Sequence, residues 1–402
     1  MSNGGLLVKK ILFMVTSMNI GGVEKSLLSL LACIPKDKYE ITLLLLDKSG
    51  GFLGYVPSHI KIEEAKWFET VKPIIMDSPY NIVKNYIKKR QHLNGIRFLF
   101  SYLIDKYFDN RYIFYKNVMR NVPANNTKYD VAISYQGPTD IIDYYIANKV
   151  KANKKISWIH FDVSKHNFNK ILYKKLYEKY NQIFVVSEQG KNRLIENIPE
   201  IKEKTDVFLN IISKDLIKGM AKDDIEFDND YKGIKIVTVG RLSKEKGQDL
   251  AIKSLKILKE DGYDVRWYCV GDGNNRLDYE KLIKKYDLEY DFILLGAKTN
   301  PYPYIKNADI YVQTSIHEGY CLTLAEAKSL AKPIVTTNFI GAYEQIQDGK
   351  NGFICDCKVE DLYRKIKDLI DNKDIQKIFY ANLVNEDIST ETEFYKLFEA
   401  ID

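Results

Sequence analysis

Two glutamates, Glu318 and Glu326, stand eight positions apart in the sequence and could offer carboxylates to a common ligand. The apolar run 308–313 predicts a short buried strand before them. Residues 322–330 predict a helix that stops before Pro333. Glu318 should therefore lie on the loop that leaves the strand, and Glu326 on the helix that follows. Carboxylates accept hydrogen bonds from hydroxyl groups, so this pair could hold the hydroxyls of a sugar.

The start of the predicted helix is a second chemical feature of this run. Its first N–H groups have no partner inside the helix and form a natural site for an anion. Gly319 lets the backbone turn tightly ahead of it. Phosphates on the N–H groups and hydroxyls on the carboxylates would suit a sugar nucleotide. The alternative is a solvated helix with two surface acids, which is the commoner meaning of this spacing when it occurs alone.

A pair of cations follows an earlier predicted strand, residues 234–239. Arg241 lies just past the strand end, and Lys246 stands five residues further on. A pyrophosphate leaving group needs such cations because negative charge builds on it as a glycosidic bond breaks. Arg can grip two phosphate oxygens, whereas Lys acts as a point charge. Taken alone, this run could also be an ordinary surface turn.

The two runs, in this order, resemble the signature of glycosyltransferase family 4, which comprises retaining enzymes of the two-Rossmann-domain fold called GT-B. The resemblance extends to further positions, namely 332–337, Gly341, Glu344 and 348–352. It departs at Cys321 and Ala331, where the family usually has glycine or another small residue. It covers residues 234–352 and is nearly absent over 47–128.

The resemblance implies a role for each of the four charged side chains. Arg241 and Lys246 would neutralise the diphosphate of a nucleotide-sugar. Glu326 would bind the ribose hydroxyls, and Glu318 would hold hydroxyls of the donor sugar. Retention would follow a front-face route in which the departing phosphate helps to deprotonate the acceptor. Because side chains supply the cations, no metal is expected.

Backbone groups are implied as well. The N–H groups of Tyr320, Cys321 and Leu322 would cradle the distal phosphate. Gly271 belongs to a Gly-Asp-Gly turn after the predicted strand 265–270, and this turn would lie beside the nucleotide base.

Two candidates lie in the first half of the chain. Gly21 and Gly22 follow the first predicted strand, where glycines allow close approach of a phosphate or sugar, although a simple tight turn is the alternative. The family has a similar glycine pair facing donor and acceptor. His160 ends another strand, where family members often place a histidine near the transferred sugar, with Asp162 a weaker candidate. A lone histidine is more often structural.

Strands alternate with helical stretches along both halves, which predicts an α/β protein with parallel sheets. We expect two Rossmann-like doubly wound domains that face each other across a cleft. The first would cover residues 1–212, and a helix at 388–402 would return to it. The second would cover 213–387, with the acidic stretch 223–230 as the hinge region.

Composition sets wide bounds on the kind of protein. Hydrophobic residues make up 45% and charged residues 28% of 402, which is typical of a globular chain. No apolar run approaches the roughly 18 residues of a spanning helix. The five cysteines are scattered, so neither a structural zinc site nor a disulfide framework is predicted. We therefore expect a cytoplasmic protein with no metal and no cofactor.

The net charge of +6 is concentrated in one segment. Residues 86–121 contain eight basic and two acidic residues, so the remainder of the chain is neutral. Nine aromatic residues fall in the same segment. Such a segment suits the surface of an anionic membrane. The main alternative is an amphipathic helix packed on its domain with Lys and Arg in water, and nucleic acid is the least favoured partner because no nucleic-acid motif accompanies it.

The sequence as a whole predicts a retaining, metal-independent hexosyltransferase. It would move a hexose from a nucleotide-sugar, a UDP-sugar by preference, to an acceptor hydroxyl on a lipid-linked or cell-surface polysaccharide precursor, as in capsule or O-antigen assembly. Contact with the inner face of the cell membrane would run through residues 86–121. The alternatives are a nucleotide-sugar epimerase of the same fold and a non-catalytic glycan-binding partner of a glycosyltransferase.

Overall fold

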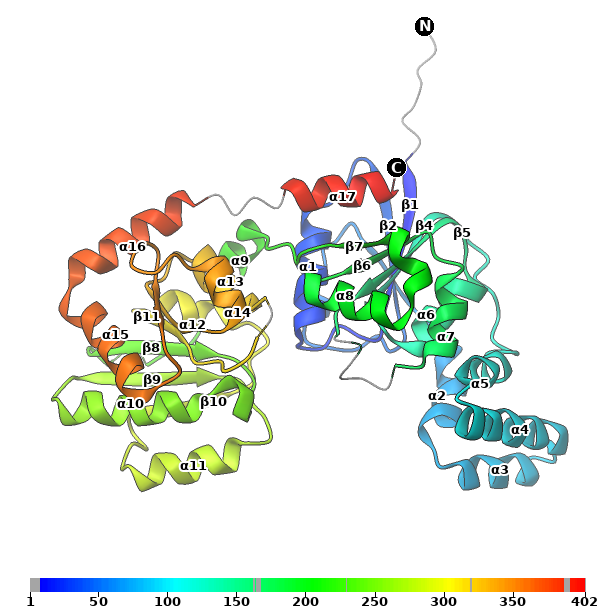
Figure 1. The fold of residues 1–402 in the computed structure, drawn as a ribbon, viewed down its shortest axis with the longest axis horizontal. Helices are drawn as coiled ribbons and strands as arrows, with labels where there is room; N and C mark the ends of the chain where they lie inside the picture. The colour runs from blue at the N-terminus through cyan, green and yellow to red at the C-terminus, as the bar shows by residue number, and fades with distance from the viewer. Residues whose placement is uncertain are drawn as a thin grey trace, which may run out of the picture. The chain divides into compact units, whose positions relative to one another are not determined.

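The computed structural model describes residues 8–161, 163, 168–228, 230–318, 320–386 and 391–401. The chain forms two compact units (Figure 1). The N-terminal unit comprises Met1–Ile211 together with Thr390–Asp402, and the C-terminal unit comprises Ile212–Ser389.

The N-terminal unit is built on a sheet of seven parallel strands in the order β3-β2-β1-β4-β5-β6-β7. The strands are β1 (Lys9–Val15), β2 (Tyr39–Leu45), β3 (Lys61–Glu64), β4 (Lys128–Gly137), β5 (Lys151–Ile159), β6 (Gln182–Val185) and β7 (Thr205–Val207). The chain winds outwards in both directions from β1, which is the order of a doubly wound sheet. The continuous apolar stretch 11–15 of β1 lies inside the sheet and is completely buried, as expected for a parallel strand covered on both faces.

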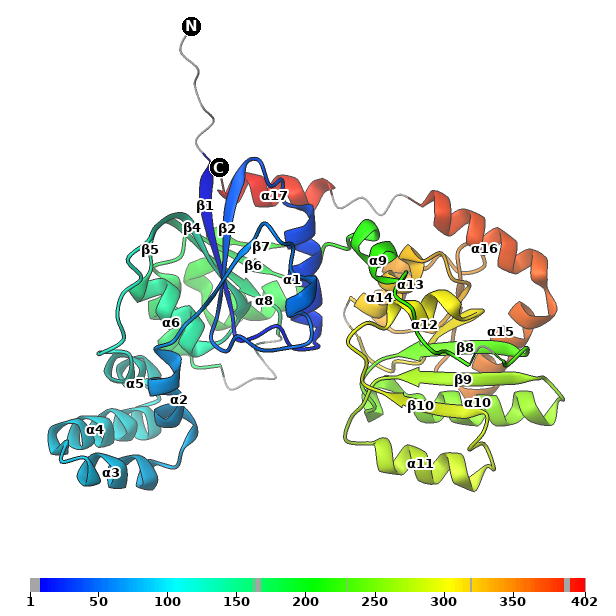
Figure 2. The ribbon, with the colours of Figure 1, turned by 180° about the vertical axis from the view of Figure 1, so that it is seen from behind.

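Helices cover both faces of this sheet (Figures 1 and 2). They are α1 (Gly22–Cys33), α6 (Asp140–Lys149), α7 (Lys170–Tyr177), α8 (Glu188–Asn197) and α17 (Glu391–Ile401), with short 3-10 turns at Leu53–Tyr55 and Pro199–Lys204. Both views show a group of further helices that projects away from the sheet. This insert consists of α2 (Phe68–Met76), α3 (Pro79–Lys88), α4 (His92–Phe108) and α5 (Arg111–Val118).

The last helix of the chain, α17, belongs to the N-terminal unit. The carboxylate of Glu393 accepts a hydrogen bond of 2.8 Å from the backbone N–H of Leu209. The ring of Phe398 stacks on that of Tyr39 with centroids 5.9 Å apart. These contacts fasten α17 to the start of β2 and to the segment after β7.

The C-terminal unit has six parallel strands in the order β10-β9-β8-β11-β12-β13. They are β8 (Ile234–Val239), β9 (Val265–Val270), β10 (Phe292–Gly296), β11 (Ile310–Gln313), β12 (Ile334–Thr337) and β13 (Phe353–Cys355). Its helices are α9 (Lys214–Met220), α10 (Gln248–Glu260), α11 (Arg276–Lys285), α12 (Tyr302–Asn307), α13 (Leu322–Ser329), α14 (Ile340–Gln345), α15 (Val359–Asp371) and α16 (Lys373–Asn385), with a 3-10 turn at Lys244–Lys246.

These two sheets confirm the prediction of two Rossmann-like α/β halves. The prediction that the acidic stretch 223–230 is the hinge region is wrong, because the division falls earlier, after Ile211. The carboxylate of Asp228 instead accepts hydrogen bonds from Arg266, at 2.7 Å, and from the hydroxyl of Tyr268, which ties this stretch to β9. That the two halves face each other across a cleft stays a prediction.

Residues 47–128, which the sequence did not place, form β3 and the helical insert. None of the helices in the described part of the chain combines the length and the apolar character needed to cross a membrane.

Candidate active site

The strand order of the C-terminal unit defines where a ligand should bind. The chain winds from β8 through β9 to β10 on one side, and from β11 through β12 to β13 on the other. In such sheets ligands bind outside the carboxyl ends of the two central strands, where the order reverses. The loops that follow β8 and β11 meet this condition, and they carry the predicted residues Arg241, Lys246 and Glu318.

These two loops are fastened to each other by hydrogen bonds. The hydroxyl of Thr314 donates to the carbonyl of Lys246 at 2.8 Å, and the N–H of Ile316 donates to the carbonyl of Glu245 at 2.8 Å. Gly247 has a φ of +65°, and a Cβ there would lie 2.2 Å from the carbonyl oxygen of Thr314. Glycine is therefore required for the close approach that positions Lys246 beside the second loop.

The approach brings Lys246 and Glu318 into direct contact, where they form an ion pair. The same carboxylate accepts a hydrogen bond of 2.6 Å from the hydroxyl of Ser315 and a longer one, 3.5 Å, from the amide of Gln313. The side chain of Glu318 is 12% exposed and that of Lys246 is 24% exposed. A ligand can thus reach both groups, while three donors fix the orientation of the carboxylate.

A buried network of polar side chains holds Gln313, which donates to the carboxylate of Glu318. The amide oxygen of Gln313 accepts hydrogen bonds from the hydroxyl of Tyr311 at 2.6 Å and from that of Thr323 at 3.2 Å. Gln313 and Tyr311 are almost completely buried, and buried polar groups are normally paired in this way. Gln313 and Ser315 were not predicted as site residues, although a glutamine at the end of an apolar strand was the available signal.

Glu326 is 2% exposed and lies on α13. Its carboxylate accepts a hydrogen bond of 3.0 Å from the hydroxyl of Tyr302, on α12. Burial, together with the charge of Glu326, holds the pKa of Tyr302 well above its ordinary value. Tyr302 therefore stays protonated and donates to the carboxylate. No sequence signal pointed to Tyr302, because it lies 24 positions before its partner.

The start of α13 presents free backbone donors. Among the described residues, no acceptor lies within hydrogen-bond distance of the N–H groups of Tyr320, Cys321 and Leu322. Cys321 is the N-cap, with a φ of −77°, so this position does not require the glycine usual in the resembled family. Gly319 lies outside the described residues. Free N–H groups at a helix start form an anion site, as the sequence predicted for this helix.

Arg241 and Gly271 occupy neighbouring loops of the same unit. The side chain of Arg241 is exposed and has no carboxylate partner within the described segments. Gly271 has a φ of +150°, and a Cβ there would lie 2.0 Å from the carbonyl oxygen of Gly240. The turn at Gly271 thus packs against the backbone just before Arg241.

Gly21 and Gly22 form the start of α1 in the N-terminal unit. Gly21 is the N-cap, and a Cβ there would lie 2.3 Å from the carboxylate of Glu24. Glu24 is 7% exposed, and burial raises its pKa while its own backbone N–H lowers it. The side chain of Glu24 therefore folds back over the glycine pair and occupies the space that the missing side chain of Gly21 leaves.

His160 follows β5 in the same unit. Its backbone N–H donates to the carbonyl of Gly137 at 2.9 Å, and its ring lies 4.7 Å from that of Tyr135. Burial lowers its pKa to about 3, and its Nε2 is buried with no hydrogen-bond partner among the described residues. The imidazole is therefore neutral near pH 7 and has one unused nitrogen. Asp162 lies outside the described residues.

The structure thus brings Lys246 and Glu318 together and places Arg241, Gly271, Tyr320, Cys321, Leu322 and Glu326 in the same unit. Gly21, Gly22 and His160 belong to the other unit, and their approach to this site stays a prediction. The described part of the chain contains no group of three or more His, Cys, Asp or Glu residues placed to hold a metal ion.

Comparison with known proteins bears on the unit that carries most of these residues. Residues 220–384 match the family model described as Glycosyl transferases group 1. This segment is therefore similar to group 1 glycosyltransferases over about two fifths of the chain. Its matched range contains all the candidate residues except Gly21, Gly22, His160 and Asp162.

Two relatives of this chain are named as enzymes that transfer sugars. An uncharacterized glycosyltransferase of Methanocaldococcus jannaschii is 30% identical over 172 residues, which cover 42% of each chain. The N-acetylgalactosamine-N,N'-diacetylbacillosaminyl-diphospho-undecaprenol 4-alpha-N-acetylgalactosaminyltransferase of Campylobacter jejuni is 28% identical over 221 residues, 54% of this chain and 59% of the relative. The chain thus spans roughly half the length of these relatives.

Solved structures extend the likeness in fold beyond the matched segment. The crystal structure of HepE from Anabaena in complex with UDP-glucose has a TM-score of 0.65 and 17% identity, and the match covers 98% of this chain and 99% of that one. At this identity the likeness shows the fold, which is the two-Rossmann-domain architecture expected from the sequence.

Proposed function

We propose that the protein is a retaining glycosyltransferase that moves a hexose from a UDP-sugar to an acceptor hydroxyl. The observation that carries the proposal is the Lys246–Glu318 pair, which lies at the reversal point of the C-terminal sheet, in the segment that matches group 1 glycosyltransferases. A cation for the diphosphate and a carboxylate for sugar hydroxyls meet there. The UDP-glucose complex of HepE, which shares the fold, supports the choice of donor.

The diphosphate would be held by groups of two kinds. The free N–H groups of Tyr320, Cys321 and Leu322 would cradle its distal phosphate. The side chains of Arg241 and Lys246 would then neutralise the negative charge that develops as the glycosidic bond breaks. Because these cations are side chains, the proposed reaction requires no metal ion and no cofactor.

The carboxylates would hold the two sugar parts of the donor. Glu326, with the hydroxyl of Tyr302 on one oxygen, would bind the ribose hydroxyls, and Glu318 would orient the hexose. A double displacement needs two carboxylates that flank the glycosidic bond. Among the described residues, no second carboxylate joins the hydrogen-bond network of Glu318, so this site does not favour that mechanism. The departing phosphate would instead help to deprotonate the acceptor on the same face of the sugar, which retains the anomeric configuration.

His160, Gly21 and Gly22 would serve the donor sugar or the acceptor from the N-terminal unit. The Nε2 of the neutral His160 imidazole can accept a hydrogen bond from a sugar hydroxyl without adding charge. The side chain of Glu24 lies over Gly21 at this helix start, where a Cβ would meet its carboxylate.

The acceptor would be a lipid-linked or cell-surface polysaccharide precursor. The relative from Campylobacter jejuni is named for an acceptor carried on diphospho-undecaprenol, which supports this choice. An acceptor held in a bilayer would bring the enzyme to the membrane surface, and the basic, aromatic segment 86–121 suits that contact. The protein would then work on the cytoplasmic side as a peripheral protein.

The proposal is tested by nucleotide binding and by product analysis. Purified protein is screened by thermal shift with UDP, GDP and ADP, and a ligand at 100 times its Kd should raise stability by about 2.7 kcal/mol. We expect UDP to give the largest shift. Incubation with UDP-glucose and candidate acceptors should yield an α-linked product from the α-linked donor. Release of an epimerised nucleotide-sugar without acceptor would favour the epimerase, and absence of any nucleotide binding would leave only the glycan-binding alternative.

A further inference from the structure

Helix α4 in the insert is apolar on two opposite sides. Its inner side packs into the insert through Gly95, Phe98 and Ser101, which are buried. Phe98 contacts the rings of Tyr86 and Phe114, with centroids 6.3 and 6.1 Å apart. This inner side accounts for the folding of the insert. A helix side that faces water is normally polar. The packing of the inner side therefore does not explain why the outer side of α4 is also apolar.

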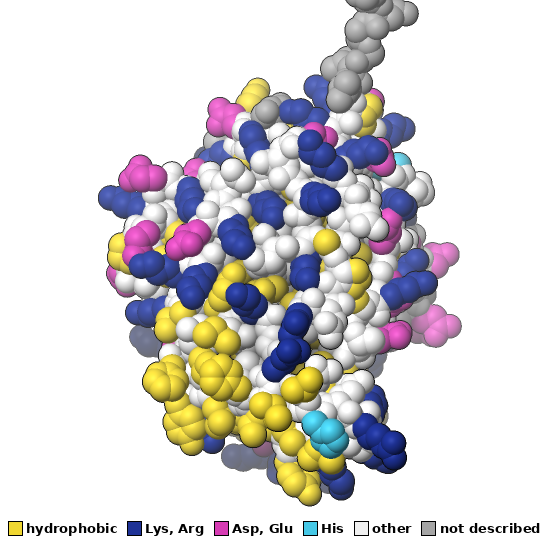
Figure 3. All heavy atoms as spheres, turned by 90° about the vertical axis from the view of Figure 1, so that its right-hand side faces the viewer, with side chains coloured by type: hydrophobic (Ala, Val, Ile, Leu, Met, Phe, Trp, Pro, Cys, Tyr) yellow, Lys and Arg dark blue, Asp and Glu magenta, His cyan; other side chains and the backbone are white. Residues whose placement is uncertain are grey.

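The outer side of α4 carries large apolar side chains that are exposed. Leu93 is 70%, Ile96 65%, Phe100 65% and Tyr107 70% exposed. Further exposed apolar residues of α2, α3 and α4 are Met76, Tyr80, Ile87, Leu99, Leu103 and Phe108. Figure 3 views the molecule from the right-hand side of Figure 1, and it shows hydrophobic side chains gathered at the lower end of that view, with Lys and Arg near them. A continuous apolar patch of this kind on a protein surface marks an interaction site.

The positive charge of the insert indicates which kind of partner would bind its apolar surface. Of the eight cations in residues 86–121, Arg111 is paired with Asp105 and Asp140. The other seven have no carboxylate within ion-pair distance in the described part of the chain, and they are Lys88, Lys89, Arg90, Arg97, Lys106, Lys116 and Arg120. A second copy of this surface would bring like charges together. Nucleic acid would leave the apolar side in water. An anionic bilayer satisfies both the charge and the apolar side chains.

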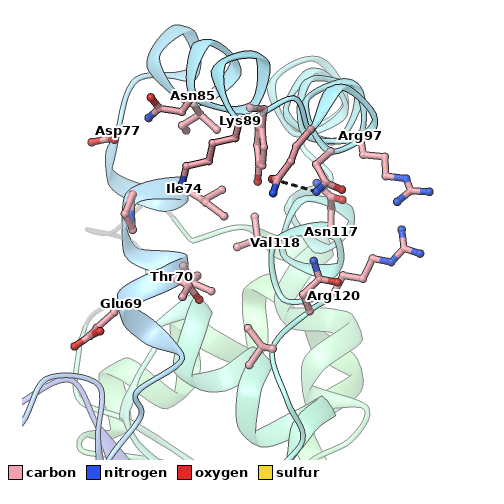
Figure 4. A pocket seen from close by; sticks show the side chains of 18 residues that line it. Glu69, Thr70, Ile74, Asp77, Asn85, Lys89, Arg97, Asn117, Val118 and Arg120 are labelled. Carbon is pink, nitrogen blue, oxygen red and sulfur yellow. Dashed lines mark hydrogen bonds between the residues drawn. The ribbon is translucent and has the colours of Figure 1, made fainter.

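A cavity of about 710 Å³ opens between α2 and α3 on one side and α4 and α5 on the other (Figure 4). Apolar residues line part of it, namely Val71, Pro73, Ile74, Ile82, Val118 and Val122. Three of the unpaired cations, Lys89, Arg97 and Arg120, also line it. In Figure 4, Lys89 extends into the cavity, whereas the side chains of Glu69 and Asp77 point away from it.

The cavity and the apolar side are connected through Arg97. At 100° per residue, Arg97 lies about 60° around α4 from Phe100. It therefore stands at the border between the outer apolar side and the cavity. In Figure 4, Arg97 and Arg120 extend toward the same edge of the cavity. If the outer side of α4 lay in the interfacial region of a bilayer, this edge would lie at the level of the lipid phosphates.

We propose that the α2–α5 insert binds anionic lipid at a bilayer surface. The outer side of α4 enters the interfacial region, and Arg97 and Arg120 hold a lipid phosphate at the edge of the cavity toward which both extend. Arginine suits this role because its planar fork binds two phosphate oxygens at once. The lipid site rests on the proposed function in one respect only. Its purpose would be to bring the enzyme to an acceptor that is held in the membrane.

The test is co-sedimentation of the full chain with vesicles of phosphatidylcholine alone or mixed with phosphatidylglycerol. We expect at least tenfold stronger binding to the mixed vesicles. The double variant I96S/F100S should weaken binding to both kinds of vesicle at least tenfold. R97Q/R120Q should abolish the preference for phosphatidylglycerol. Matched controls in the C-terminal unit are Y290S, at a side chain that is 84% exposed, and K281Q/K284Q, which removes two exposed lysines; both should bind as the wild type does.

Several outcomes would overturn the inference. The first is that the wild type sediments with neither kind of vesicle. The second is that the controls lose as much binding as the insert variants. A concentration-dependent dimer in light scattering that I96S/F100S abolishes would assign the surface to a second copy. If inorganic phosphate shifts the melting temperature of the wild type but not of R97Q/R120Q, while no vesicle binds, the cavity is a site for free phosphate.

The same variants separate this inference from the proposed function. UDP should raise the melting temperature of I96S/F100S as much as that of the wild type, because the substitutions lie in the other unit. Vesicle binding without any nucleotide binding would overturn the proposed function alone. Nucleotide binding without vesicle binding would overturn the lipid site alone.

Discussion

At the scale of single residues, Lys246 and Glu318 form an ion pair with each other. In the proposed reaction, each group would exchange this partner for a substrate group. The sequence assigned the two residues separate roles, on the phosphate and on the sugar. The contact between them could not be predicted, because it depends on two loops that lie 72 positions apart in the chain.

Replacement of Lys246 by alanine should lower transfer strongly. In the proposed reaction this cation would stabilise charge on the leaving diphosphate, and loss of one such group costs about 3–4 kcal/mol in the transition state. We expect kcat to fall by roughly 100-fold or more in an assay of sugar transfer. Lys253→Ala on α10 is the matched control, since that lysine only pairs with Asp249 on the same helix. Equal rates in the two variants would remove Lys246 from the mechanism.

His160 should make stability depend on pH. Its pKa is lowered to about 3 by burial, so the folded protein binds fewer protons than the unfolded chain between that value and the ordinary pKa of about 6.5. Its neutral form therefore favours folding above pH 6.5, and this contribution is lost as the pH falls below it. At pH 5 the loss should amount to about 2 kcal/mol relative to pH 7.

Urea unfolding at pH 7 and pH 5 measures this effect. His160→Gln cannot titrate, so the stability difference between wild type and variant should shrink by about 2 kcal/mol on going to pH 5. His92→Gln, at an exposed position of α4, controls for the loss of an imidazole elsewhere. An unchanged difference between wild type and His160→Gln would show that the ring is accessible to protons in the folded state.

At the scale of elements, the end of α13 shows a misfit between residue and conformation. The N–H of Lys332 bonds to the carbonyl of Ala327 at 3.2 Å, and that of Ala331 to the carbonyl of Lys328 at 2.8 Å. This is the Schellman pattern, in which the residue after the C-cap adopts a left-handed conformation. Ala331 does so with a φ of +52°, although glycine suits this conformation better.

Ala331→Gly should therefore stabilise the protein. Relief of the left-handed strain should exceed the entropy that glycine adds to the unfolded chain, for a net gain of about 1 kcal/mol. The measurement is the midpoint of thermal or urea unfolding. Ala381→Gly, at an exposed position inside α16, should have the opposite sign and cost about 1 kcal/mol. Destabilisation by both substitutions would mean that the cap imposes no strain on Ala331.

The sequence predicted the elements of the C-terminal unit well because each buried strand is a short apolar run between turn residues. The strands Ile234–Val239 and Val265–Val270 were predicted with the bounds that the structure shows. The insert escaped prediction because α4 is apolar on both sides, which removes the period that distinguishes a helix facing water. The roles of Tyr302 and Gln313 were not predicted either, since only the fold brings Tyr302 to Glu326 and Gln313 to Glu318.

At the scale of the whole molecule, the candidate diphosphate-binding residues fall in one unit and the helical insert in the other. Protection from hydrogen exchange can therefore report on the two proposed ligands separately. We expect UDP to protect the loops 240–247 and 314–323 in the full chain, because their backbone groups lie where the diphosphate would bind. Residues 86–121 should be unaffected by UDP and should be protected by vesicles that contain phosphatidylglycerol.

The placement of α17 has a consequence for the order of synthesis. The C-terminal unit is a continuous stretch, Ile212–Ser389, whereas the N-terminal unit needs Thr390–Asp402 to be complete. On the ribosome, the half that is made first must therefore wait for this helix until the whole of the second unit, Ile212–Ser389, has been translated. The half that begins second can close first, and the surface that α17 finally covers, at Tyr39 and Leu209, stays open to chaperones during that interval.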